Sequence, residues 1–316
     1  MLADVEVVSG LTDSATVVQI PDPATALAFR TTASGRSDLF VVGPRTRGRY
    51  HAGKGVPVCV RLRLRPGVAR ALFGIPIQAL ADRTVRITDL WGTDGAALTA
   101  SLKAAAPDTA RVLDLLQNAV GSRLGFPTEG AFPSRAPRPP DPFTPTATAQ
   151  PVPTRADSQF SVPAGAALFG ASAGAVGVGS PAGAIRVDSS PEVAAAEAWA
   201  PDDGLLAAAV RSLSGGSRRL ADAAVDLGVS ERHLRNVFAR EIGLSPKHFA
   251  RITRLRRVLE EAGTRQWSSL ADDAGFFDQA HMISDFRAFM GVTPAAFTAG
   301  RLPPTTPCSE LTRLTG

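Results

Sequence analysis

The chain has 316 residues, a length that favours two domains, and its 44% hydrophobic content is ordinary for a globular protein. Its two cysteines, Cys59 and Cys308, lie far apart and form no CxxC motif, which excludes a disulfide framework and a zinc knuckle. The net charge of +5 is carried almost wholly by arginine and indicates a polyanionic partner, although a GC-rich genome would produce the same arginine bias.

The first ten residues, MLADVEVVSG, carry Asp4 and Glu6 and have neither the basic start nor the long apolar core of a secretory signal. Together with the scarcity of cysteine, this segment predicts a cytoplasmic protein.

Residues 1–126 are predicted to form a β-rich domain, because residues 15–95 hold apolar, β-branched stretches punctuated by Gly and Pro. RTVRITDLWG, residues 83–92, is one of the predicted strands. The stretch at residues 56–67, VPVCVRLRLRPG, alternates most regularly, so its valines and leucines are expected to face the core. Its other face is predicted to be solvated, with an anion site as the alternative, and carries Arg61, Arg63 and Arg65.

Residues 107–125 place Val112, Leu113, Leu116 and Val120 on one stripe and predict an amphipathic helix that closes the N-terminal domain. Two roles for this helix stay open, packing on the sheet and forming a dimer surface.

Residues 127–198 are predicted to be a long, disordered linker rich in Pro, Ala and Gly, without helical or strand periodicity. Residues 162–185 carry no charge, but they are mainly Ala, Gly and Ser and are broken by proline. Few large apolar side chains are present to drive insertion into a bilayer, so we expect no membrane span.

Residues 199–302 are predicted to be helical, and residues 303–316 to be a disordered tail. Within the helical region two segments repeat one pattern: SERHLRNVFAREIGLSP begins at Ser230, and DQAHMISDFRAFMGVTP begins at Asp278, 48 residues later. Both segments place histidine, phenylalanine, glycine and proline at matching positions.

Each segment follows a short, alanine-containing helix that ends at a glycine, Gly228 or Gly275. Glycine permits the left-handed conformation of a tight turn, and Ser230 and Asp278 are predicted to cap the next helix. This layout predicts two helix-turn-helix units. Arginine forks onto guanine, and Asn or Gln onto adenine, so the polar outward side chains of each second helix suit base recognition, although they are also ordinary surface residues.

A single helix over residues 245–263 is predicted to join the two units. At 1.5 Å per residue it would be about 28 Å long. Successive major-groove segments on one side of DNA lie about 34 Å apart, so we expect this helix to hold both recognition helices in adjacent segments.

The region from about residue 204 to 300 resembles the DNA-binding domain of the AraC/XylS family of bacterial transcription regulators. The residues that carry the resemblance are GVSERHLRNVF, the pair GLSP and GVTP, and LADDAGFFDQAHMISDFRAFMGVTPAAF. The resemblance implies an all-α double helix-turn-helix domain whose recognition helices both enter the major groove of double-stranded DNA. By position, the implied base-facing residues are Arg232, Arg235 and Asn236 in the first helix, and Gln279, Ala280, His281, Ile283 and Ser284 in the second.

Two residues depart from the family pattern. Ser284 stands where many relatives have a basic residue, and Asp285 is expected to face phosphate unfavourably. The second unit is therefore expected to bind less tightly or to read fewer bases, with Arg287 compensating through the DNA backbone.

Residues 40–92 are similar to an uncharacterised domain that precedes such helix pairs in related regulators, through VVGP, RLRPGVARALFGIPIQALADR and DLWG. This resemblance implies a sensing or dimerising module, jelly-roll-like in form, with an unknown small-molecule effector and a homodimer formed through it. The family pattern also implies activation through contact with RNA polymerase. The long linker is expected to loosen any rigid coupling between the domains.

No metal site, cofactor or catalytic centre is predicted. His233 and His281 occupy matching positions of the repeat, but no Cys, Asp or Glu cluster joins them at ligand spacing. HExxH, P-loop and GxGxxG dinucleotide motifs are absent from the sequence. The connecting helix carries four arginines that could form a phosphate-facing stripe: Arg251, Arg254, Arg256 and Arg257. As the alternative, Arg256 and Arg257 are partly neutralised within the helix by Glu260 and Glu261, four residues on.

Three functions therefore remain open. The favoured one is a sequence-specific transcription regulator that is not an enzyme. The alternatives are an enzymatic or ligand-processing N-terminal domain recruited to DNA by the helices, and a protein-binding module built from degenerate helix pairs.

Overall fold

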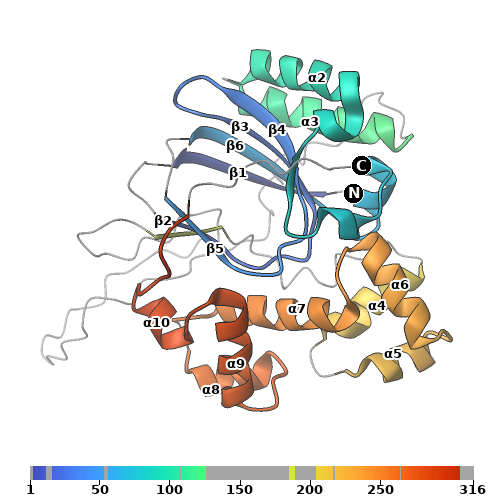
Figure 1. The fold of residues 1–316 in the computed structure, drawn as a ribbon, viewed down its shortest axis with the longest axis vertical. Coiled ribbons are helices and arrows are strands. Elements are labelled where there is room, and N and C mark those ends of the chain that lie inside the picture. Colours follow the sequence, from blue (N-terminus) through green and yellow to red (C-terminus); the bar gives the residue numbers. More distant parts are fainter. Residues whose placement is uncertain are drawn as a thin grey trace, which may run out of the picture.

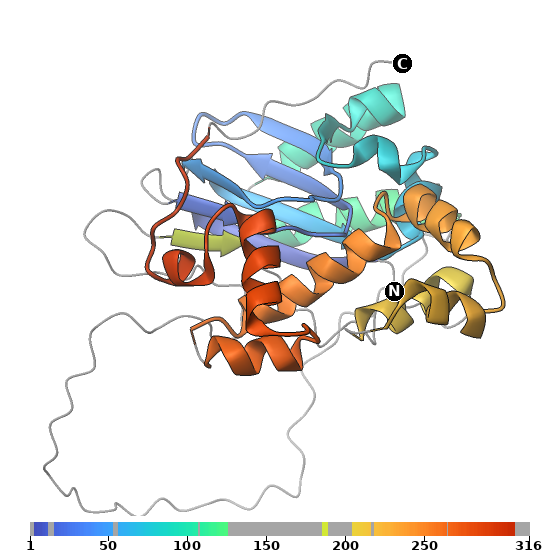
Figure 2. The same cartoon turned by 60° about the horizontal axis from the view of Figure 1, so that its bottom comes forward.

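The molecule is built around a β-sheet layer that lies between two groups of helices (Figures 1 and 2). The computed structural model describes residues 3–11, 16–52, 56–106, 108–125, 185–188, 204–215, 218–263 and 265–306. All described strands except Ile185–Asp188 lie in the N-terminal region, and the described residues from 204 onward are helical, as the sequence predicts.

Two sheets carry the strands. The larger is antiparallel with the order β1-β6-β3-β4-β7, and its strands are Ala3–Leu11, Val56–Leu64, Ala26–Thr31, Ser37–Val42 and Thr84–Arg86. The smaller sheet has the order β5-β2-β8, with strands Arg49–Ala52, Thr16–Gln19 and Ile185–Asp188. The jelly-roll-like form stays a prediction. Ile185–Asp188 falls within the predicted linker, whose other residues up to 198 lie outside the described part of the chain.

One face of the larger sheet is covered by α1 (Val68–Phe73), η1 (Ile77–Leu80), α2 (Thr88–Ala105) and α3 (Thr109–Arg123). The predicted amphipathic helix over residues 107–125 is confirmed by α3, whose buried stripe packs in the core below the helices. Alternation along β6 buries the side chains Val60, Leu62 and Leu64 in the same core, as the sequence predicts.

The prediction of strands as far as residue 95 is wrong beyond Arg86. DLWG lies in α2, where Trp91 turns inward and its ring packs 6.0 Å from that of Phe73. The backbone leaves the helical conformation at Gly92, with φ 54° and ψ −126°, so a short helical turn that begins at Thr88 precedes the main part of α2. The residues after Gly92 are rich in Ala and Leu, which are strong helix formers.

The C-terminal half consists of α4 (Leu205–Ser214), α5 (Leu220–Asp226), α6 (Glu231–Glu241), α7 (Pro246–Glu260), α8 (Trp267–Asp273), α9 (Gln279–Met290) and α10 (Pro294–Thr298). These helices share a core centred on Phe238, Phe249 and Phe286. The connecting helix α7 has 15 residues instead of the predicted 19, so it is about 22 Å long. It ends early because Glu261 leaves the helical conformation and Gly263 adopts φ 89°.

The arginine face of β6 is not solvated, which corrects the sequence-based prediction. Arg61 and Arg63 keep only 7% and 4% of their exposed area, because the C-terminal helices cover this side of the sheet. Val18, Ile20 and Tyr50 of the smaller sheet join the core of the C-terminal helices. The expected loose coupling between the two halves is therefore also wrong for the described residues, which form a shared, packed interface.

The end of the chain returns to the smaller sheet. Thr306 N donates to Tyr50 O over 2.8 Å, so the first residues of the predicted tail pair with β5. Residues 307–316 of that tail lie outside the described part of the chain. None of the helices that the structure describes has the length and apolar character needed to cross a bilayer.

Candidate nucleic-acid interface

Two helix-turn-helix units have matching backbone geometry. The first is α5, turn and α6, and the second is α8, turn and α9. In the turns, Gly228 and Gly275 have φ values of 65° and 78°, in the left-handed region that glycine tolerates best. The residue after each glycine donates to the carbonyl of an alanine, Ala224 in one unit and Ala271 in the other, over 3.0 and 2.9 Å.

The second helix of each unit begins with the same type of cap. Ser230 Oγ accepts from His233 N over 3.1 Å, and Asp278 Oδ1 accepts from His281 N over 2.6 Å. These bonds satisfy backbone donors that a helix leaves open at its start. The repeat seen in the sequence is thus a repeat of hydrogen bonds.

The polar residues of α6 that resemble base-facing residues are on its open side. Arg232, Arg235 and Asn236 are exposed, whereas Leu234 and Phe238 point into the core. Arg235 pairs with Glu231 one turn earlier, so this carboxylate holds the guanidinium when no other partner is present.

The corresponding residues of α9 also face outward, with one exception. Ile283 is partly buried against the helical core, which leaves little of its side chain for DNA. The exposed members of the set are Gln279, Ala280, His281, Ser284 and Arg287.

Asp285 is buried, which corrects the expectation that its side chain faces outward. Only 4% of its area is exposed, and Arg251 of α7 binds it with contacts of 2.7, 3.1 and 3.2 Å. The hydrogen bonds to Asp285 raise the pKa of Arg251, so its guanidinium stays charged. The pair instead fixes α9 to α7.

The arginines of α7 do not form one phosphate-facing stripe. Arg251 is engaged with Asp285, and Arg254 lies over the Phe276 ring at 4.9 Å and donates to Gly275 O. Arg256 is buried, with 4% of its area exposed, on the side that faces the N-terminal domain. Helical spacing could have shown this, because Arg256 lies four residues after Ile252, on the inward side of α7.

The buried carboxylate of Asp22 connects the two halves of the molecule. Arg63 donates to its two oxygens over 2.8 and 3.3 Å. Arg45, Arg61 and, from α7, Arg256 each lie 3.9 Å from it. All five side chains are buried, so the structure gathers four guanidinium groups from both halves around one carboxylate.

Burial alone would raise the pKa of Asp22, but the charges of Arg63, Arg256 and Arg45 outweigh it and hold the pKa well below the ordinary value. Arg256 also donates to Pro21 O over 3.1 Å, which adds a bond between α7 and the segment after β2.

The N-terminal domain also holds the C-terminal ends of both recognition helices. After α6, Gly243 lies so close to Ile77 that an added Cβ would stand 2.8 Å from the Ile77 carbonyl oxygen. At the end of α9, Gly48 N donates to Phe289 O over 2.8 Å and Tyr50 Oη donates to Met290 O over 2.6 Å.

A helix leaves its last carbonyls without internal partners, and here another domain supplies the donors. Burial raises the pKa of Tyr50, so its hydroxyl keeps the proton that it donates. We call these three contacts together the interdomain clasp: the Asp22 cluster, Gly243 on Ile77, and the α9 end on Gly48 and Tyr50. Sequence reasoning did not identify these residues as functional.

The described residues contain no group of three or more His, Cys, Asp or Glu side chains that could hold a metal ion. His233 and His281 stand on separate helices, and the ring of His281 packs against Phe276 at 5.5 Å.

Residues 208–300 match the family model of a helix-turn-helix domain, and the match spans both units described above. This region is an AraC-type helix-turn-helix domain. AraC-type domains belong to DNA-binding regulators of transcription, so the match gives this half of the chain that character. No match to a curated protein was found.

Solved structures similar to this chain include an AraC-type regulator from Chromobacterium violaceum, at 25% identity over 32% of this chain and 94% of that chain, with a TM-score of 0.28. A probable AraC family regulator from Rhodopseudomonas palustris CGA009 matches at 24% identity over 30% and 98%, with a TM-score of 0.25. ToxT from Vibrio cholerae O395 matches at 10% identity over 94% and 96%, with a TM-score of 0.34. These scores are too low to establish a shared fold.

Proposed function

We propose that the protein is a sequence-specific transcription regulator in which two helix-turn-helix units read adjacent major-groove segments of double-stranded DNA. The observation that carries the proposal is the pair of equally capped recognition helices, α6 and α9, whose polar outward residues are exposed. The AraC-type family match over both units supports the same reading.

Within this proposal, base contacts come from Arg232, Arg235 and Asn236 in the first unit. Arginine offers a forked donor to guanine, and asparagine pairs with the edge of adenine. In the second unit Gln279 is the strongest base reader, with His281 and Ser284 beside it. Arg287, one turn further along α9, suits a phosphate contact because its charge is exposed.

The N-terminal domain controls the DNA-binding domain through the interdomain clasp. The clasp holds α6 and α9 at their C-terminal ends and leaves their capped starts open. Any effector or partner that alters the sheet would therefore change the positions of both recognition helices without covering them. RNA polymerase and a second copy of the chain are further proposed partners.

Selection of bound sites from a random DNA pool by the full-length protein tests the proposal. We expect a site with two short sequence blocks about one helical turn apart. The double variant Arg235→Ala with Asn236→Ala should relax one block by about 1–3 kcal/mol of discrimination for each lost base contact and leave the other unchanged.

Arg111→Ala is a matched control, because Arg111 is an exposed arginine on α3, on the far side of the sheet. It should select the same site as the unaltered protein. If the unaltered protein enriches no sequence above random DNA, the proposal fails. Binding with no dependence on salt would favour the protein-binding alternative, because no phosphate counterions would then be released.

A further inference from the structure

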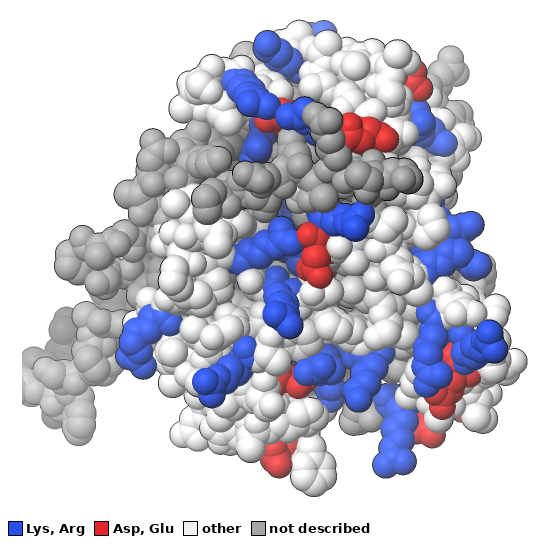
Figure 3. Space-filling model, in the orientation of Figure 1, with Lys and Arg blue, Asp and Glu red and all other residues white. Residues whose placement is uncertain are grey.

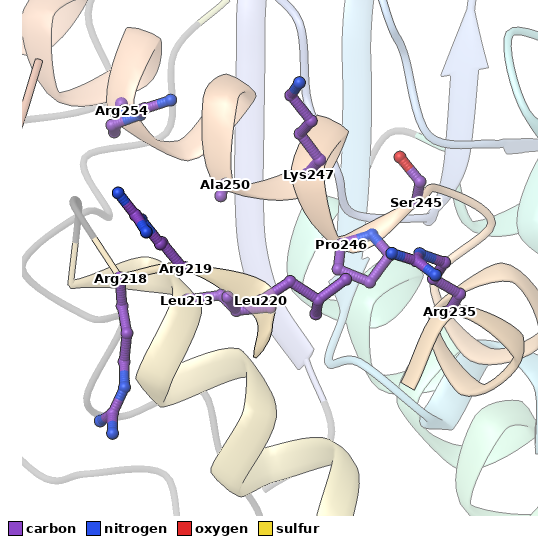
Figure 4. A pocket seen from close by; sticks show the side chains of 10 residues that line it. All are labelled: Leu213, Arg218, Arg219, Leu220, Arg235, Ser245, Pro246, Lys247, Ala250 and Arg254. Carbon is purple, nitrogen blue, oxygen red and sulfur yellow. The ribbon is translucent and has the colours of Figure 1, made fainter. Parts of the chain in front are cut away.

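A basic hollow of about 550 Å³ opens beside the first recognition helix, between the start of α5 and the start of α7 (Figure 4). Its other lining residues are small or apolar except Ser245, and no carboxylate is among those that the structure describes. Five cationic side chains line it: Arg218, Arg219, Arg235, Lys247 and Arg254.

The cations reach the hollow from the segment just before α5 and from the helices α6 and α7. Arg219 extends toward α7, Lys247 and Arg254 come from α7, and Arg235 comes from α6 (Figure 4). Arg218 points away from α7 and pairs with Asp226. Elsewhere on the same side of the molecule, Lys and Arg side chains recur across the helices below the sheet, with some acidic side chains between them (Figure 3).

The charge in the hollow is only partly neutralised by the protein. Arg235 pairs with Glu231, and Arg254 donates to the Gly275 carbonyl. Arg219 and Lys247 form no ion pair with any described residue, and the Nε of Arg254 has no hydrogen-bond acceptor there. Arg219 and Lys247 are exposed, so water screens the repulsion between them, and both charges remain available to attract an anion that enters the hollow.

The position of the hollow indicates which kind of anion it binds. In a helix-turn-helix protein the recognition helix lies in the major groove, and the helix before it crosses the DNA backbone. In the first unit that crossing helix is α5, which begins directly after Arg219. On the other flank lies the start of α7, a 15-residue helix whose N-terminal dipole also favours phosphate.

We infer that this hollow binds the phosphodiester backbone beside the groove that α6 reads, with Arg219 and Lys247 as phosphate contacts. The inference rests on the proposed function and adds a second class of residue to it. Contacts from this hollow fix the register and orientation of α6 on the duplex and carry no sequence information of their own.

The salt dependence of DNA binding by the full-length protein tests the inference. Each phosphate contact releases counterions and adds about 0.9 to the slope of log K against log salt concentration. Arg219→Ala and Lys247→Ala should each remove about one such increment. When the salt concentration rises from 50 to 200 mM, the affinity of each variant should fall by a factor that is about three- to fourfold smaller than the factor for the unaltered protein.

Both variants should select the same DNA sequence as the unaltered protein, in contrast to the Arg235 and Asn236 double variant. Arg111→Ala is again the control and should keep the full slope. Thermal unfolding followed by circular dichroism checks that each variant is folded, since both altered side chains are exposed.

Two outcomes overturn the inference. One is an unchanged salt slope in both variants while the unaltered protein still selects its site, which would leave the proposed function intact. The other is tight calorimetric binding of inorganic pyrophosphate that both substitutions abolish while DNA binding persists, because the hollow would then serve a free phosphate compound. If the unaltered protein selects no DNA site at all, the proposed function itself is contradicted.

Discussion

At the scale of single residues, the buried carboxylate of Asp22 lies where the arginine face of β6 meets Arg256 of α7. The alternation along β6 correctly separates the inward Leu62 from the arginine face, because a strand has a period of two. What covers that face depends on partners far away in the chain: Arg256 comes from α7, more than 200 residues after Asp22. Local periodicity gives a side chain its direction but not the surface it meets.

The charge of Asp22 should make the stability of the protein sensitive to acid. Its folded pKa lies below the unfolded value of about 3.9, so its ionised form stabilises the fold fully above about pH 4. That contribution is lost as the pH falls through the folded pKa. Replacing Asp22 leaves several buried arginines without their shared carboxylate, so Asp22→Asn should cost about 3–5 kcal/mol at pH 7.

Denaturant unfolding of the two proteins between pH 2 and 8 measures this prediction. The difference in unfolding free energy should be constant from pH 5 to 8 and should shrink in stronger acid. Asp94→Asn is the control, because Asp94 makes an exposed pair with Arg123, and it should change stability little at any pH. A difference that persists unchanged in strong acid would contradict the role given to this carboxylate.

At the scale of elements, the helix-turn-helix repeat was readable from sequence because its determinants are local. Gly275, Asp278 and the apolar stripe of α9 lie within one short segment, and each acts on its own neighbours. The helix α2 was missed because β-branched residues at its start favour a strand, and helix formation there depends on Trp91 packing against α1. The interdomain clasp could not be predicted from the sequence, because contacts such as that of Gly243 with Ile77 join residues far apart in the chain and produce no local pattern.

The two glycines on either side of α6 offer a matched pair of substitutions. Gly228 and Gly243 both have positive φ, so an alanine at either position costs about 1–2 kcal/mol in backbone strain. Nothing lies within 4 Å of an added Cβ at Gly228, whereas at Gly243 it would meet the Ile77 carbonyl. Gly243→Ala should therefore be clearly more destabilising than Gly228→Ala, and the excess reports the domain contact.

Thermal or denaturant unfolding of the two variants gives that excess directly. Equal losses at the two positions would show that the approach to Ile77 contributes nothing to the interface.

At the scale of the whole molecule, the spacing of the recognition helices does not depend on α7 alone. At about 22 Å this helix is shorter than the repeat of the DNA duplex. The N-terminal domain holds the far ends of both recognition helices, that of α6 through η1 and that of α9 through Gly48 and Tyr50. Two helix pairs and the domain that bridges them therefore set the geometry together.

Full-length protein should consequently prefer one distance between the two sequence blocks. A variant with a weakened clasp, Tyr50→Phe combined with Gly243→Ala, should accept insertions or deletions of one or two base pairs with a smaller loss of affinity. Binding to a series of spacer lengths measures this tolerance, and Gly228→Ala serves as the control. The same spacing profile for all three proteins would show that the sheet does not set the geometry.

The backbone hydrogen bond from Thr306 to Tyr50 of β5 is one of several contacts that attach the helical half to the N-terminal domain. Besides Thr306, the residue that follows α6, a side chain of α7 and the end of α9 also contact the N-terminal domain. All of these contacts join the surfaces of two folded parts of the chain. Complementarity of this kind does not require a peptide bond between the partners. The covalent link raises the effective concentration of each half near the other. A chain that is cut between the two halves should therefore stay together as a noncovalent complex.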